Sequence, residues 1–187
     1  MRFVLIIIAL CEALISPACA HTGVGPVNSF SAGVAHPLSG ADHFIAMTMV
    51  GIWSVTVGGR AIAVLPAAFV AAMLAGFVAA NVGLQIAFAE QAICLSVILL
   101  GVLVALRVRA PVWQGAVIVG LFAFFHGHAH GTEASAAKLI PYAAGFVLGT
   151  AALLAVGITA GLCVKALAAY SGWVRGSGRI VSIGRLT

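Results

Sequence analysis

Five long apolar segments, separated by short polar breaks, decide what this chain can fold into. They cover residues 34–57, 61–80, 83–106, 112–131 and 139–164. Only 7% of the 187 residues are charged, whereas a soluble domain carries about a quarter, so a soluble globular fold is excluded. Disorder is excluded as well, because 63% of the residues are hydrophobic and disordered chains are poor in such residues. We therefore expect an all-α integral membrane protein built as a single bundle of transmembrane helices.

Residues 1–20 have the pattern of a cleaved signal peptide. Arg2 supplies the positive charge, residues 3–10 form an apolar centre, and small residues at 18–20 provide a cleavage site. Eight apolar residues rise about 12 Å as a helix, far less than the roughly 30 Å of a bilayer core. An uncleaved anchor is the alternative. Cleavage leaves His21 as the new N-terminus, on the outer side of the membrane.

Basic residues in the polar breaks orient the predicted helices. If the mature chain starts outside, five spans leave only Lys138 of the later basic residues on the outer side. Seven fall on the cytoplasmic side, namely Arg60, Arg107, Arg109, Lys165, Arg175, Arg179 and Arg185. This distribution follows the positive-inside rule. The basic residues are dispersed rather than clustered with aromatic residues, so no nucleic-acid partner is expected. We interpret residues 166–187 as an interfacial tail.

Two of the apolar runs are too short to cross a bilayer. Phe44–Val57 and Val112–Phe125 contain fourteen residues each and rise about 21 Å, against a core of about 30 Å. The missing depth must come from His36–His43 in the first case and from His126–Glu133 in the second. Both polar stretches lie at the outer ends of their helices, where buried polar groups cost several kcal/mol unless they are partnered.

The three acidic residues outside the predicted signal peptide are predicted to lie at the same depth in the membrane. Asp42 and Glu133 lie in the two polar stretches, and Glu90 has sixteen apolar residues on its inner side. This spacing places Glu90 in the outer half of the third span. Three segments distant in sequence are therefore predicted to bring their carboxylates and histidines together.

The second polar stretch has the spacing of a metal site on a helix. His126, His130 and Glu133 follow one another at i, i+4 and i+7 and so share one face, while His128 points away. Imidazole and carboxylate groups on adjacent turns are suitable ligands for a divalent metal. The GxxxG pattern at 127–131 allows a neighbouring helix to approach closely.

The first polar stretch needs a break to act in the same way. His36 and His43 are about 10.5 Å apart along a straight helix and cannot hold the same ion. Pro37 removes a backbone donor and Gly40 permits irregular backbone, which predicts a broken or re-entrant segment. Such a segment folds His36 back towards Asp42 and His43, and irregular backbone is tolerated in a membrane where it lines a site.

Simpler interpretations exist for single residues. Any one histidine could be a hydrogen-bond donor between helices, the run from 126 to 130 could be a solvated loop with His128 in it, and His21 could be a flexible terminus. The three methionines in the apolar segments are expected to pack rather than bind metal. The candidate metal ligands are His36, Asp42, His43, Glu90, His126, His130 and Glu133, and His128 and His21 are further candidates.

Two motifs make the chain resemble a known family. His36-x5-Asp42-His43, inside HPLSGADHFIAMTMVG, and FHGHAHGTE at 125–133 are similar to the HupE/UreJ family along nearly the whole chain. These are small membrane proteins associated with hydrogenase and urease maturation and regarded as nickel permeases. The resemblance implies a multi-pass protein of the bacterial cytoplasmic (inner) membrane with its mature N-terminus in the periplasm. It places both motifs and Glu90 on a metal path. The family commonly has six spans, so we expect five to six transmembrane helices.

The predicted function is transport of a divalent metal, with no enzymatic activity and no organic cofactor. Nitrogen and oxygen ligands without thiolate suit Ni²⁺, Co²⁺, Zn²⁺ or Cu²⁺, so the choice of nickel rests on the resemblance. A phosphate-binding GxxxxGK[ST] loop is absent from the sequence. The expected partners are the metal ion, membrane lipid and a hydrogenase or urease maturation system, and a homo-oligomer is left open. The alternatives are an accessory protein or sensor that binds metal without moving it, and an intramembrane metal-dependent hydrolase.

Overall fold

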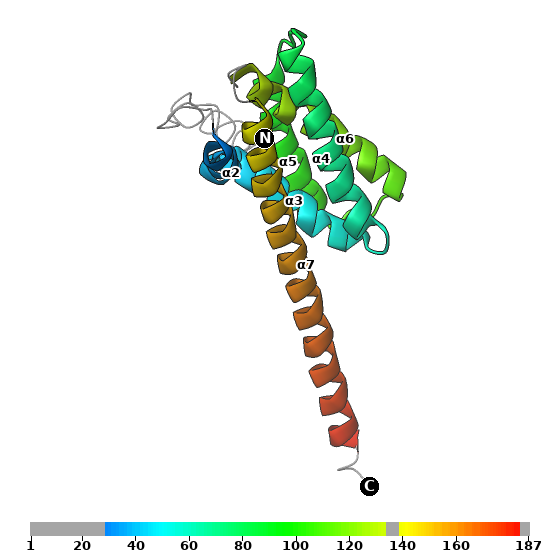
Figure 1. Ribbon diagram of the computed structural model, residues 1–187. Coiled ribbons are helices and arrows are strands. Elements are labelled where there is room, and N and C mark those ends of the chain that lie inside the picture. Colours follow the sequence, from blue (N-terminus) through cyan, green and yellow to red (C-terminus); the bar gives the residue numbers. More distant parts are fainter. Residues whose placement is uncertain (1–28, 134–138, 184–187) are drawn as a thin grey trace, which may run out of the picture.

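The part of the chain that the structure describes is helical. The computed structural model describes the backbone of residues 29–133 and 139–183, and the side chains of 29–132 and 139–171. The helices are α2 (Phe30–Ser39), α3 (Ala41–Val57), α4 (Ala61–Asn81), α5 (Ala89–Ala105), α6 (Val112–Glu133) and α7 (Leu139–Ile183). The prediction of an all-α fold is confirmed (Figure 1). The predicted signal peptide and His21 lie outside the described residues.

Within the described ranges, three helices are long and apolar enough to cross a membrane. They are α4, the segment Val112–Thr132 of α6, and the segment Leu139–Ser171 of α7. The helices α3 and α5 are apolar but have only 17 residues each. The protein is therefore a helical membrane protein in which two shorter helices pack among three full-length ones.

Two helices differ in extent from the predicted spans. α5 begins at Ala89 rather than at residue 83, because Gly83 and Phe88 have positive φ angles of 91° and 71° that interrupt helical backbone. α7 continues to Ile183 through the predicted tail from residue 166. An isolated glycine costs a helix only about 1 kcal/mol, so the glycines of this stretch do not end it. Figure 1 shows the second half of α7 projecting beyond the other helices.

Helices α4 and α6 run parallel, and their backbones touch. A Cβ atom on Gly127 would lie 1.8 Å from the carbonyl oxygen of Met73, and one on Gly131 would lie 2.6 Å from that of Phe77. Nearer the start of both helices, Gly115 faces the side chain of Leu65. The close approach predicted from the GxxxG pattern at 127–131 is confirmed.

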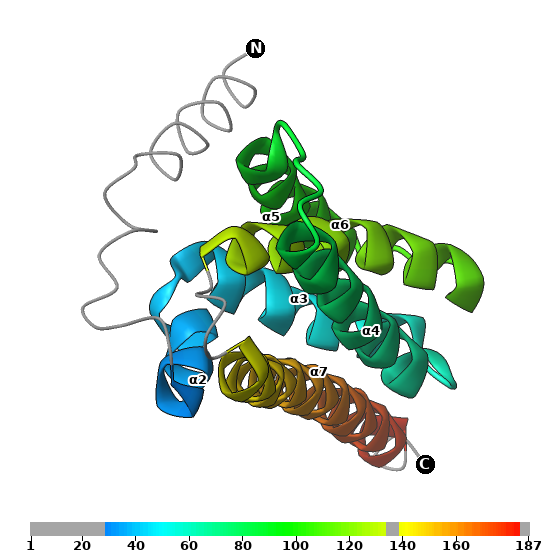
Figure 2. The ribbon, with the colours of Figure 1, turned by 45° about the horizontal axis from the view of Figure 1, so that its top comes forward.

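α7 runs parallel to α2 and α3, and glycines again allow the helix backbones to approach closely. A Cβ atom on Gly33 would lie 2.2 Å from the carbonyl oxygen of Tyr142, and one on Gly157 would lie 2.1 Å from that of Thr48. Figure 2 shows α2 beside the first turns of α7. Alternation along the chain therefore brings the starts of α3, α5 and α7 to the same end of the bundle as the last turns of α4 and α6.

The two ends of the bundle carry different residues. We call one the histidine end, because the last turns of α6 and the start of α3 meet there. We call the other the arginine end, because its connections contain Arg60, Arg107 and Arg109. Apolar side chains fill the bundle between them. The fully buried ones include Met47, Val50, Trp53, Leu65, Phe69, Met73 and Val119. Two of the three methionines are thus core residues, and Met49 packs against the same cluster.

Candidate metal centre

A break between α2 and α3 lies beside the first histidine motif. α2 ends at Ser39, Gly40 is extended with φ −88° and ψ 120°, and α3 begins at the next residue. A Cβ atom on Gly40 would lie 2.9 Å from both the Asp42 carboxylate and the His43 ring, so the lack of a side chain leaves them room. The predicted break is confirmed.

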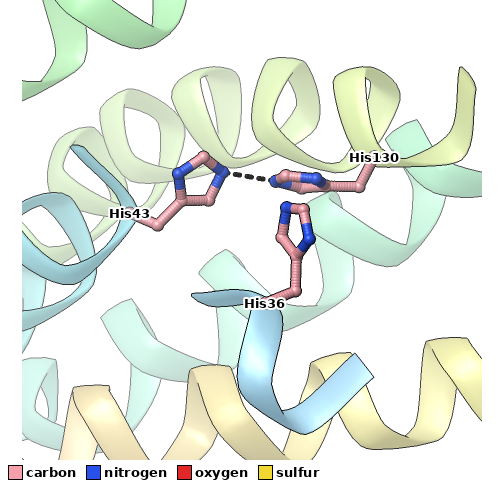
Figure 3. A group of neighbouring side chains, drawn as sticks. All are labelled: His36, His43 and His130. Atoms are coloured by element: carbon pink, nitrogen blue, oxygen red, sulfur yellow. Dashed lines mark hydrogen bonds between the residues drawn. The ribbon is translucent and has the colours of Figure 1, made fainter. Parts of the chain in front are cut away.

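The break lets His36 turn back towards His43, and both meet His130 of α6. One nitrogen atom from each of these three rings lies within 4.8 Å of the other two. The ring centres are 5.9 Å apart for His36 and His43, 4.4 Å for His36 and His130, and 4.5 Å for His43 and His130. Figure 3 shows the rings converging from three separate helical segments. We call His36, His43 and His130 the three-histidine group.

Asp42 fixes the orientation of the His43 ring. Its Oδ1 accepts hydrogen bonds from His43 Nδ1 at 2.6 Å and from the His43 backbone N–H at 2.9 Å. With the proton on Nδ1, His43 Nε2 presents a lone pair, and it is hydrogen-bonded to His130 Nε2. A carboxylate that holds the far nitrogen of an imidazole is the usual support for a metal-binding histidine.

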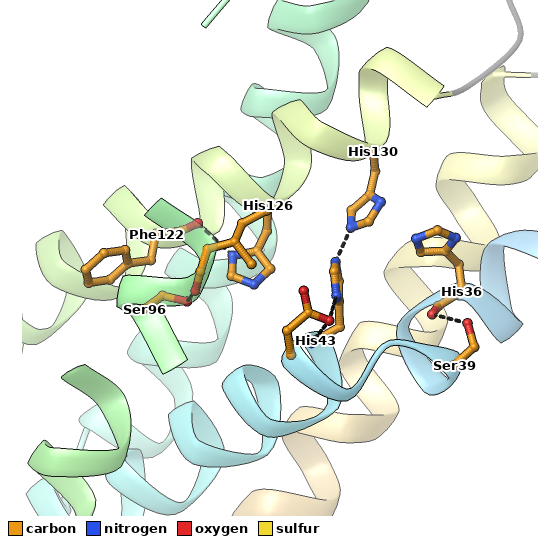
Figure 4. Close-up of polar contacts among 9 residues, drawn as sticks. His36, Ser39, His43, Ser96, Phe122, His126 and His130 are labelled. Carbon is orange, nitrogen blue, oxygen red and sulfur yellow. Dashed lines mark hydrogen bonds and ion pairs between the residues drawn. The ribbon is translucent and has the colours of Figure 1, made fainter. Parts of the chain in front are cut away.

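His126 lies beside the group, one turn along α6 from His130. Its ring is fully buried, and its centre is 5.2 Å from that of His43. Its Nδ1 donates to the Phe122 carbonyl at 2.9 Å, so Nε2 presents a lone pair. Within the described part of the chain this nitrogen has no hydrogen-bond partner. Figure 4 shows the His126 ring on the other side of His43 from His36.

His128 points away from these rings, as the helical spacing predicts. Its Nε2 donates to the carbonyl of Leu84, in the connection between α4 and α5, at 2.8 Å. The interpretation of residues 126–130 as a solvated loop is wrong, because the run is helical and His126, His128 and His130 are all at most 3% exposed. Backbone contact with α4 through Gly127 and Gly131 excludes water from this turn.

The predicted acidic residues are distributed differently from the histidines. Asp42 is in contact with the three-histidine group, and 30% of its side chain is exposed. Glu90 is in the first turn of α5 at the same end of the bundle, but it is exposed and does not join the group. Glu133 is the last residue of α6, and its side chain is not among those described.

Aromatic residues surround the group, and sequence reasoning did not select them. The Phe146 ring centre is 4.6 Å from that of His130, and Tyr142 is 6.2 Å from His36. Phe69 of α4 lies 6.0 Å from His126. The only sequence signal was the spacing of four residues between Tyr142 and Phe146, which puts them on one face of α7.

The donor atoms of this arrangement are of the kind that divalent transition metals prefer. Three imidazole nitrogens, with a fourth buried imidazole and a carboxylate next to them, suit Ni²⁺, Co²⁺, Zn²⁺ or Cu²⁺. Burial of neutral imidazoles costs less than burial of charged ligands, and a bound cation satisfies their lone pairs.

Comparisons with known proteins agree with these motifs. The family model described as "HupE / UreJ protein" matches residues 8–186. The chain is also 43% identical over 148 residues to Protein HupE of Rhizobium leguminosarum bv. viciae, which is 78% of each chain. No solved structure matches it.

Proposed function

Because the chain belongs to the HupE/UreJ family, we propose that it is a permease that moves Ni²⁺ from the periplasm into the cytoplasm. The metal would supply hydrogenase or urease maturation. The observation that carries this proposal is the convergence of His36, His43 and His130 from separate helical segments onto a common position. Histidines that only joined neighbouring helices would not need to meet in this way.

The metal ion enters the three-histidine group from the exposed side of Asp42. The three rings are buried or half-buried, whereas Asp42 keeps 30% of its side chain exposed at the histidine end. A carboxylate at that position attracts a hydrated cation and then supports His43 as a ligand. Glu90, exposed at the same end, adds a second negative charge near the start of the path.

His126 is the next ligand along the path. Its buried Nε2 lone pair lies beside His43, one turn further from the end of α6. An ion that leaves His36 and His130 can remain bound to His43 while it gains His126. Exchange of one ligand at a time avoids exposing a bare divalent ion to an apolar interior.

Uptake of radioactive nickel into cells tests the proposal. Cells that express the chain should accumulate more intracellular nickel than cells without it, and Asp42→Asn and Glu90→Gln should each reduce the initial rate. Competition by Co²⁺ and Zn²⁺ measures the preference for nickel. The variant proteins must be present in the membrane in equal amounts, which immunodetection establishes. Expression that raises metal binding without ever raising intracellular nickel contradicts the permease.

The apolar core favours a second candidate, a metal-binding accessory protein or sensor. Between His126 and the arginine end, the described residues form a closed apolar cluster in which Trp53, Leu65 and Val119 are fully buried. The buried hydroxyl groups of Ser54 and Ser96 donate to carbonyls of their own helices. Nickel that binds purified protein but never crosses the membrane of a sealed vesicle identifies this second function. Metal-dependent turnover of lipid or peptide by the same sample would instead identify a hydrolase.

A further inference from the structure

Glycines in α2 and α7 allow the backbones of these helices to touch beside the three-histidine group. A Cβ atom on Gly33 would lie 2.2 Å from the Tyr142 carbonyl oxygen, and one on Gly145 would lie 2.0 Å from that of Phe30. Gly149 meets Pro37 in the same way, one turn further along. No larger residue fits at these positions while the helices keep this separation. The first turns of α7 are therefore held against the segment that carries His36.

This contact places two aromatic rings of α7 against the histidines. The Phe146 ring is tilted against His130 at a centre distance of 4.6 Å, and it lies 6.2 Å from His36. The Tyr142 ring is also 6.2 Å from His36. Both aromatic side chains are only 1% exposed. We call Tyr142 and Phe146 the aromatic wall.

The aromatic wall is buried and closely packed. Its two rings are nearly parallel, at 5° to one another, and Phe77 of α4 stacks on Tyr142 at 6.3 Å. Three helices thus hold the wall in place. On the other side of the group, Asp42 is 30% exposed. Water therefore has access to an ion in the three-histidine group from the Asp42 side and not from the side of α7.

We propose that Phe146 and Tyr142 determine the hydration of the bound ion, excluding water from the α7 side while the three imidazoles replace the water lost there. The inference rests on the proposed function, since it takes the three-histidine group to be the position of a divalent metal. A hydrophobic shell around a metal site controls the access of solvent. The ion is then held with fewer than six ligands and partly dehydrated, a state in which it can exchange one imidazole of the group for that of His126.

Cobalt absorption spectroscopy on the purified protein in detergent tests this inference. Co²⁺ is a stand-in for Ni²⁺, and its visible d–d bands weaken strongly as the coordination number rises to six. The wild-type protein with Co²⁺ should show intense bands. Phe146→Ala opens the α7 side to water, and its bands should be several-fold weaker. Phe146→Leu keeps apolar bulk and should lie between the two.

Leu154→Ala is the matched control. Leu154 is also on α7 and 2% exposed, so the substitution removes buried apolar bulk in the same helix, away from the histidines. Its cobalt spectrum should equal that of the wild type. Bound cobalt with an unchanged spectrum in both Phe146 variants overturns the role of the aromatic wall and leaves the proposed function intact. If Phe146→Ala does not fold, the Phe146→Leu spectrum decides. Wild-type protein that binds no cobalt and no nickel overturns the proposed function itself.

Discussion

The two ends of the bundle are closed by the same kind of contact but hold different chemistry. At the histidine end, the His128 ring N–H donates to the carbonyl of Leu84 in the connection between α4 and α5. At the arginine end, the Trp53 ring N–H donates to the carbonyl of Val108 in the connection between α5 and α6, at 2.9 Å. Each connection also contains a non-glycine residue in left-handed backbone, Phe88 or Arg107 respectively. The connections therefore resemble one another in construction.

The interiors next to these contacts differ. The histidine end buries the rings of His43, His126, His128 and His130, and Asp42 beside His43 is 30% exposed. The arginine end buries Trp53, Leu65 and other apolar side chains. Under the proposed function, a cation is held at the histidine end and opposed by the apolar arginine end. If the proposed function holds, metal binding and the barrier to metal movement lie in separate parts of the bundle, and substitutions at each end test them separately.

The largest expected effect comes from helix contact at the histidine end. Gly127→Ala puts a Cβ atom 1.8 Å from the Met73 carbonyl oxygen, so α4 and α6 must separate. We expect a loss of about 3 kcal/mol or more in stability, the upper range for overpacking. Thermal unfolding in detergent measures it.

Gly120→Ala is the control on the same pair of helices, nearer the arginine end. Its Cβ atom would lie 3.6 Å from Ala72, an ordinary contact. Because alanine favours helix over glycine by up to about 1 kcal/mol, the unfolding temperature should stay the same or rise. Equal destabilisation by both substitutions would show that the closeness of the helices does not differ between the ends.

A smaller effect, on metal affinity, is expected from alanine substitutions of His126 and His128. His126→Ala removes a buried lone pair beside His43 and should weaken Ni²⁺ binding about 10- to 100-fold, the range seen when the supporting shell of a metal site is disrupted. His128→Ala should be milder, because that ring faces Leu84 instead. Calorimetric titration of purified protein compares them. The reverse ranking would mean that the metal binds on the other face of α6.

The smallest effect is expected at the two connections. His128→Phe removes the donor to Leu84, and Trp53→Phe removes the donor to Val108. A single hydrogen bond contributes about 0.5–1.5 kcal/mol, so each connection should open more often and exchange its amide hydrogens faster. Hydrogen exchange read by mass spectrometry reports each one separately. His128→Gln keeps an N–H donor and should preserve the protection of the α4–α5 connection, which a role in packing alone would not require.

Local pattern in the sequence predicted the features that depend on local geometry. The break followed from Gly40, whereas Pro37 lies inside α2, and the shared face of His126 and His130 followed from helical spacing. The close approach at 127–131 followed from small residues alone. In each case the property is set within about two turns of helix, so periodicity and backbone preference are sufficient.

The features that sequence did not predict depend on which helices meet. Tyr142 and Phe146 look like ordinary apolar residues until α7 is placed against α2. Helical spacing predicted that His128 points away from the other rings, but not its partner, Leu84, which is 44 positions away. Glu90 lies outside the three-histidine group, in the first turn of an α5 that begins only at Ala89, after left-handed backbone at Phe88. Contacts of this kind are fixed by tertiary packing rather than by spacing.

The break at Gly40 also shapes the electric field at the histidines. The last carbonyls of α2 and the first amides of α3 lie beyond the hydrogen-bond pattern of their own helices, and side chains meet two of them, because Ser39 Oγ donates to the His36 carbonyl and Asp42 accepts from the His43 amide. These two ends carry about half a negative and half a positive elementary charge respectively, and they oppose one another over a few ångströms. Asp42, in the first turn of α3, then tips the balance to negative. The N-terminus of α3 on its own would repel a cation. With the end of α2 and the Asp42 carboxylate beside it, the local field instead favours a cation in the proposed function.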